Sequence, residues 1–135
     1  VHQADRYFLD GDMALAMTLY DQVLNDPDLR AWRNNEDDIL RAYSLYRALV
    51  AQVIIGQQGD LTIVYQRIND TFPTDDIVYA QMSRIFFEAY GVAADISQAC
   101  TAVRELIDQR PEALDLINRY GERSPTYTVN DMCPF

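Results

Sequence analysis

Apolar side chains recur along almost the whole chain at the three- and four-residue spacing of an α-helix. Glycine and proline residues divide this pattern into segments of helix length. One segment, 62–65, has the composition of a strand, but Gly59-Asp60 before it and Pro73 after it favour a helix. The sequence therefore predicts an all-α chain of about seven helices joined by short loops.

The ends of the expected helices are marked by residues that favour helix caps. Each glycine follows an apolar segment, where a residue that tolerates left-handed backbone is expected to end a helix: Gly11, Gly56, Gly59, Gly91 and Gly121. The expected N-caps are Asp12, Asn34 or Asn35, Asp60, Thr74 and Asp95. Asp75 and Asp76 follow one of these caps, and the helix dipole favours acidic residues in a first turn.

The composition is that of one folded domain with little material for catalysis. The 135 residues (15.5 kDa) contain 49% apolar and 24% charged side chains, which is typical of a globular protein with a core. A formal net charge of −10 without any lysine argues against nucleic acid as a partner, and no apolar run is long enough to span a membrane. Nucleotide-binding, hydrolase and zinc-protease motifs are absent and His2 is the single histidine, so we expect no enzyme activity, cofactor or metal.

Three segments align with one another as an internal repeat of helix pairs. The turns Gly11-Asp12, Gly59-Asp60 and Ala94-Asp95 fall at equivalent places. The fourth residue after each Asp is small or β-branched, and the eighth is apolar or aromatic: Ala16, Val64 and Ala99, then Tyr20, Ile68 and Val103. The repeats span about residues 4–27, 36–73 and 75–110, with a capping helix over 111–120 and a tail over 121–135.

The first repeat resembles the tetratricopeptide repeat family. Its Gly11-Asp12, Ala16, Tyr20 and Pro27 follow the family's second-helix pattern, although Pro27 comes one residue early. The other two repeats depart from it, with Gln52 and Phe87 where the family has a small residue. The resemblance implies an array of antiparallel α-hairpins, a right-handed solenoid with a concave face that binds proteins or peptides. An unrelated compact helical bundle is the alternative.

The two cysteines are expected to pair. Cys100 lies on an apolar helical stripe, whereas Cys133 lies in the polar tail, where a thiol has no packing role. A bond between them would close a loop of about 33 residues, stabilise the fold by about 3–4 kcal/mol and pack the tail, including Tyr127, over the end of the array. Such a bond indicates an extracytoplasmic location, and its absence would favour the cytoplasm.

Three residues of an inserted loop and one tyrosine are candidates for contact with a partner. Trp32 lies on no apolar stripe and is flanked by Arg30 and Arg33, so it is either an interface anchor or the residue that folds the loop onto the helices. Tyr79 would line the groove or pack in the core.

Together these features favour a non-catalytic module that binds a protein or peptide. We expect it to be the C-terminal part of a longer, exported or envelope-associated bacterial protein. The negative charge, concentrated in the first half of the chain, would attract a cationic partner or serve only solubility. The alternatives are an array that only stacks on itself or on further repeats, and an all-α enzyme whose site lies partly outside this sequence.

Thiol alkylation tests the predicted disulfide. The mass of the intact protein should stay unchanged when alkylating reagent is added without reductant, and should rise by two alkyl groups after reduction, because both cysteines are then free. Alkylation of both cysteines in freshly prepared, unreduced protein would contradict the pairing and remove the main argument for an oxidising compartment.

Overall fold

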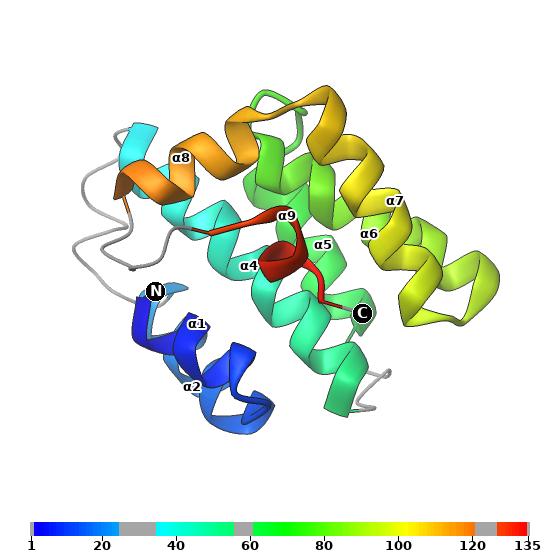
Figure 1. Cartoon of the computed structure of the whole chain (residues 1–135), viewed down its shortest axis with the longest axis horizontal. Coiled ribbons are helices and arrows are strands. Elements are labelled where there is room, and N and C mark those ends of the chain that lie inside the picture. Colours follow the sequence, from blue (N-terminus) through cyan, green and yellow to red (C-terminus); the bar gives the residue numbers. More distant parts are fainter. Residues whose placement is uncertain (1, 25–34, 56–60, 121–126, 135) are drawn as a thin grey trace.

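Eight α-helices and no strand make up the part of the chain that the computed structural model describes, residues 2–24, 35–55, 61–120 and 127–134. The all-α prediction is confirmed, and the helix beyond the expected seven is a short one in the tail, which has the label α9. In chain order the helices are α1 (His2–Leu9), α2 (Met13–Leu24), α4 (Asn35–Ile55), α5 (Leu61–Thr71), α6 (Val78–Ala93), α7 (Ile96–Gln109), α8 (Glu112–Tyr120) and α9 (Val129–Met132) (Figure 1).

The predicted turns of the first and third repeats are present. Gly11 lies between α1 and α2 with a φ of 90°, a backbone conformation that favours glycine. Asp12 then caps α2, because its carboxylate accepts a hydrogen bond from the Leu15 N–H at 3.3 Å. Asp95 caps α7 in the same way, accepting from the Ser97 N–H at 2.9 Å. The turn at Gly59-Asp60 and the predicted cap Asn34 lie outside the described residues.

The prediction that Gly91 ends a helix is wrong. Gly91 lies within α6, which continues to Ala93. The residue that takes the left-handed conformation is Ala94, with a φ of 52°, and its N–H donates to the carbonyl of Tyr90 at 2.7 Å. The helix therefore ends at Ala93, two residues beyond the glycine, where this bond closes its last turn.

The predicted start of the next helix at Thr74 is also wrong, since α6 begins only at Val78. Thr74 lies in a non-helical segment, where its hydroxyl donates to the carboxylate of Asp76 at 2.9 Å. Asp75 and Asp76 consequently lie before the helix and not in its first turn.

Two arginines from other parts of the fold hold this segment in its non-helical form. Arg84 of α6 donates to the carbonyl of Phe72 at 2.8 Å and forms an ion pair with the carboxylate of Asp75. Arg110, which follows α7, donates to the carbonyl of Asp75 at 2.7 Å and to that of Asp76 at 3.3 Å. Because these backbone carbonyls are bound to side chains, they need no partners within a helix.

The core lies around α4, which packs against α2, α5 and α6. Every residue of α4 from Arg41 to Val53 is buried. The neighbouring helices bury apolar faces against α4 or, as α7 does, against α6, and the described repeat positions are fully or almost fully buried: Ala16, Tyr20, Ile68, Ala99 and Val103. The two helices of each predicted pair contact each other: α1 with α2, α4 with α5, and α6 with α7. The right-handed solenoid itself remains a prediction.

Two glycine substitutions test the backbone assignments. Gly91→Ala should raise the free energy of unfolding by about 0.5–1 kcal/mol, because alanine is the better helix former and a Cβ there meets no atom within 4 Å. At Gly11 an added Cβ also meets no atom within 4 Å, but the positive φ there strains any residue with a Cβ. Gly11→Ala should therefore lower the free energy of unfolding by about 1–2 kcal/mol. Urea unfolding of both variants checks the opposite signs, and equal effects would contradict the assignments.

Candidate functional site

The most concentrated chemistry of the described chain is a buried ion pair between Asp5 of α1 and Arg47 of α4. Both side chains are excluded from solvent, and Arg47 Nε lies 3.5 Å from Asp5 Oδ1. Three tyrosine hydroxyls donate hydrogen bonds to the Asp5 carboxylate: Tyr20 of α2, Tyr43 of α4 (at 2.7 Å) and Tyr127 of the tail. The carboxylate therefore joins segments from both ends of the chain.

The Arg47 guanidinium is held by the remaining groups around it. Its Nε donates to the hydroxyl of Tyr43 at 2.8 Å, and the guanidinium carbon lies 4.6 Å from the ring centroid of Phe8. On the tail side, Nη1 donates to the carbonyl of Met132 at 3.2 Å, and Nη2 lies 3.9 Å from the Met132 sulfur. The cation thus contacts α1, α4 and α9 together.

This network is satisfied within the protein and presents no reactive group to solvent. Removing two charges from water is costly, and the cost is offset only when the ions pair and their other hydrogen-bonding groups find partners. Asp5 and Arg47 meet that condition through tyrosine hydroxyls and a backbone carbonyl. The arrangement can hold helices and tail in one geometry, and both charged side chains are buried.

The tail reaches the network as an ordered segment, which Figure 1 shows crossing α4 between α1 and α7. Asn118 of α8 holds its beginning, since the Asn118 side chain exchanges two hydrogen bonds with the backbone of Tyr127, at 2.7 and 3.3 Å. A capping box between Thr128 and Asp131 then starts α9. The described tail packs back onto the helices as predicted, and Tyr127 reaches across to Asp5 of α1.

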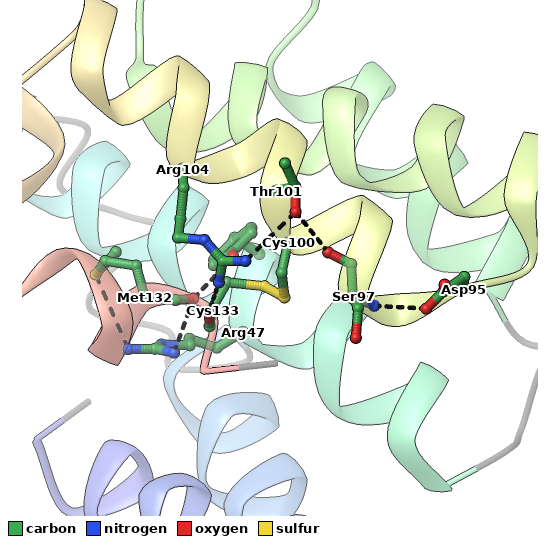
Figure 2. The surroundings of a disulfide bond; sticks show 9 residues. Arg47, Asp95, Ser97, Cys100, Thr101, Arg104, Met132 and Cys133 are labelled. Carbon is green, nitrogen blue, oxygen red and sulfur yellow. Dashed lines mark hydrogen bonds between the residues drawn. A yellow bond between two sulfur atoms is a disulfide. The ribbon is translucent and has the colours of Figure 1, made fainter.

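The end of the described tail is fastened to α4 and α7. The hydroxyl of Tyr46 donates to the carbonyl of Met132 at 2.8 Å, and Nη1 of Arg104 donates to the carbonyl of Cys133 at 2.9 Å. Arg47, described above, also binds the Met132 carbonyl, and Figure 2 shows Arg47 and Arg104 on either side of the tail. The backbone carbonyls of the tail are therefore bound to side chains of the helices.

Cys100 and Cys133 lie at disulfide distance, as the sequence predicts. Their Cα atoms are 5.4 Å apart, both side chains are fully buried, and the bond joins the middle of α7 to the residue that follows α9 (Figure 2). The loop it closes spans 33 residues, a length for which the chain-entropy model gives a stabilisation of about 3–4 kcal/mol.

Of the four candidate partner-binding residues, the structure describes only Tyr79. Trp32, Arg30 and Arg33 lie outside the described residues. Of the two places that the sequence allowed for Tyr79, a groove or the core, the structure has it in the core, with its side chain fully buried. Its hydroxyl donates to the carbonyl of Ala113 in α8, and its ring packs edge-on against Tyr43 at 5.1 Å. The packing of α8 over α6 is what encloses this tyrosine.

Sequence reasoning missed the ion pair, although one signal was present. Arg47 interrupts the apolar residues of a helix whose two faces are both buried, and an arginine in such a run needs an anionic partner nearby. Asp5 carries no comparable signal, because it lies in a short helix among polar neighbours. The identity of the partner depends on how α1 packs against α4.

Neither a metal centre nor a membrane span is found among the residues with described positions. No group of three or more histidine, cysteine or carboxylate side chains there could hold a metal ion, and no helix there is long and apolar enough to cross a membrane. The chain also matches no protein-family model, and it has no significant match among curated proteins or solved structures. The functional proposals therefore rest on the contacts described above.

Substitutions of the ion pair test its role in stability. Arg47→Met should lower the free energy of unfolding by about 3–5 kcal/mol, because it leaves the Asp5 carboxylate buried without its cation. Asp5→Asn should also destabilise, and the double variant should lose clearly less than the sum of the two losses. Glu112→Gln is the control: it breaks the partly exposed pair with Arg110 (2.7 Å) and should cost about 0–1 kcal/mol. Additive losses at Asp5 and Arg47 in urea unfolding would contradict the coupling.

Because four tyrosines are buried in the core, we expect the free energy of unfolding to fall in alkali. Burial raises the pKa of Tyr20, Tyr43, Tyr46 and Tyr79 above the ordinary value of 10.0, and the nearby negative charge of Asp5 raises the pKa of Tyr20 further. A group whose pKa is higher in the folded state stabilises the fold fully below the pKa of the unfolded state. The free energy of unfolding should therefore be steady up to about pH 9 and fall as the pH rises past 10.

Circular dichroism and absorbance at 295 nm, recorded together between pH 8 and 12, check this expectation. Part of the tyrosine ionisation should occur only with the loss of helix, because burial raises the pKa of these hydroxyls in the folded protein. Complete ionisation of all tyrosines near pH 10 with full retention of helix would contradict it.

Proposed function

We propose that this chain is a non-catalytic helical domain that binds a protein or peptide partner, as part of an exported or envelope-associated bacterial protein. The observation that carries the proposal is the fastened tail. A disulfide and several polar contacts hold the chain's last described residues against α1, α4 and α7. Such reinforcement suits a small domain that works outside the cytoplasm, where disulfides persist.

The burial of the two charged side chains, Asp5 and Arg47, supports a binding role over a catalytic one. Asp5 and Arg47 are enclosed and fully engaged with tyrosines, Phe8 and the tail. A catalytic acid or base must reach its substrate, and these two groups do not. Their role in the proposal is to keep the helices that carry the binding surface in place.

The charge of the chain supports a cationic partner. A formal net charge of −10 gives a long-range attraction to basic proteins and peptides, which increases their rate of association and weakens as salt screens it. Trp32 is the proposed anchor for such a partner, since tryptophan is enriched among residues that dominate binding energy. Its neighbours Arg30 and Arg33 repel cations, so their proposed contacts are with neutral or acidic groups of that partner.

Affinity capture with matched variants tests this function. The wild-type chain should retain a basic protein from an extracytoplasmic fraction, with less retained as salt increases, and Trp32→Ala should retain much less of it. Val92→Ala is the control, because Val92 is 91% exposed in α6 and its truncation should change nothing. Equal capture by the wild type and Trp32→Ala would contradict the role of Trp32.

Light scattering across a concentration series distinguishes the alternative function, an array that only stacks on itself. A mass that rises with concentration, together with no captured partner, would favour self-stacking. A monomer at all concentrations with a partner lost in Trp32→Ala would favour the binding module.

A further inference from the structure

A cavity of about 270 Å³ lies where the start of α4, the segment before α6 and helix α8 meet. Its described lining consists of three half-buried apolar side chains, Ile39, Ile77 and Leu116, and of Asp76, which is exposed. Figure 1 shows α8 beside the start of α4, and we call this place the α4–α8 cavity. Its volume is below the roughly 300–1,000 Å³ that encloses a whole small-molecule ligand, so it suits a single side chain.

Asp76 brings to this cavity a negative charge with which no arginine of the described ranges forms an ion pair. Arg84 pairs with Asp75, and Arg110 pairs with Glu112. Arg110 reaches Asp76 only at its backbone carbonyl, at 3.3 Å. Three carboxylates and two guanidinium groups therefore meet here, and one negative charge is left at the solvent edge of an apolar cavity.

We propose that the α4–α8 cavity binds the side chain of an arginine that a partner peptide presents. The aliphatic stem of the arginine packs against the three apolar side chains, and its guanidinium binds the carboxylate of Asp76. Long basic side chains commonly bury the stem and keep the charged head in water. Arginine suits this place better than lysine, because its guanidinium is more weakly hydrated and can donate two parallel hydrogen bonds to a carboxylate.

This inference rests on the proposed function, since the arginine belongs to the basic partner proposed above. It deepens that function by naming what the partner presents and a surface that receives it, separate from the anchor Trp32.

Contacts behind the lining hold the walls of the cavity in place. Arg110 binds the carbonyl of Asp76, and the hydroxyl of Thr74 donates to its carboxylate at 2.9 Å. On α8, the carbonyl of Ala113 accepts a hydrogen bond from the hydroxyl of Tyr79. These contacts are internal to the chain and need no ligand, so the binding of an arginine requires little further ordering.

Methyl NMR with a single-residue probe tests the cavity. The probe is N-acetyl-arginine amide, titrated at constant ionic strength into the wild-type chain labelled at isoleucine and leucine methyl groups. The signals of Ile39, Ile77 and Leu116 should shift and saturate together, because one bound probe contacts all three. Ile63 is the internal control, since its side chain is 63% exposed in α5 and its signal should not follow this curve. N-acetyl-citrulline amide has nearly the same shape without the charge and should bind about threefold or more weakly.

Two variants separate the charge from the apolar contact. Asp76→Asn should bind the arginine probe about threefold or more weakly and the citrulline probe as the wild type does, because it removes only the charge. Leu116→Ala should weaken both probes alike, because it shortens an apolar wall. Asp10→Asn is the matched control for net charge and should change neither. Asp10 is exposed in the turn between α1 and α2, which Figure 1 shows well away from α8.

Three results would overturn the proposal. They are the lack of a saturable shift at the three lining methyl groups, equal binding of the arginine and citrulline probes, and equal binding of the arginine probe by the wild type and Asp76→Asn. If circular dichroism shows that Leu116→Ala loses helix, the comparison with Asp76→Asn still decides, because that side chain is exposed.

The outcome is distinguishable from that of the proposed function. A partner captured through Trp32, with no arginine bound in the cavity, would contradict only this inference. Arginine bound in the cavity, with equal capture by the wild type and Trp32→Ala, would contradict only the proposed role of Trp32.

Discussion

The ion pair between Asp5 and Arg47 is the constraint on which the rest of the described structure depends. Two buried charges are tolerated only if they meet each other and if every remaining polar atom around them finds a partner. Those partners come from α1, α2, α4 and the tail, so they include both ends of the described chain. These segments must therefore reach their native positions together, because any one of them missing would leave polar groups unsatisfied.

The disulfide complements this network by acting on a different state of the chain. The polar contacts lower the free energy of the folded tail, whereas the bond between Cys100 and Cys133 chiefly restricts the unfolded chain. The two effects meet at Cys133, whose sulfur is bonded to α7 and whose carbonyl accepts from Arg104. The described tail is thus held by polar contacts and a covalent bond in addition to the burial of Tyr127, Met132 and Cys133.

Local features of the fold were predictable from the sequence, and long-range ones were not. The helices were predictable because periodicity and the cap residues Asp12 and Asp95 are local features of the sequence. The disulfide was predictable because the chain has only two cysteines. The expected helix start at Thr74 failed because arginines distant in the sequence bind the backbone there. The sequence left Tyr79 open between a groove and the core, because nothing around it shows that α8 will pack where its hydroxyl bonds to Ala113.

The buried polar network also supplies what a repetitive apolar pattern lacks. Helix pairs with similar apolar faces can be packed in several orders and registers at comparable hydrophobic energy. A charge pair is not interchangeable in this way, because any arrangement that separates Asp5 from Arg47 leaves an ion buried alone, at a cost of about 3–5 kcal/mol. The tyrosines that meet Asp5 come from α2, α4 and the tail, so the same penalty selects one relative placement of all three. Apolar burial drives the helices together, and the ion pair distinguishes the native arrangement from its near equivalents.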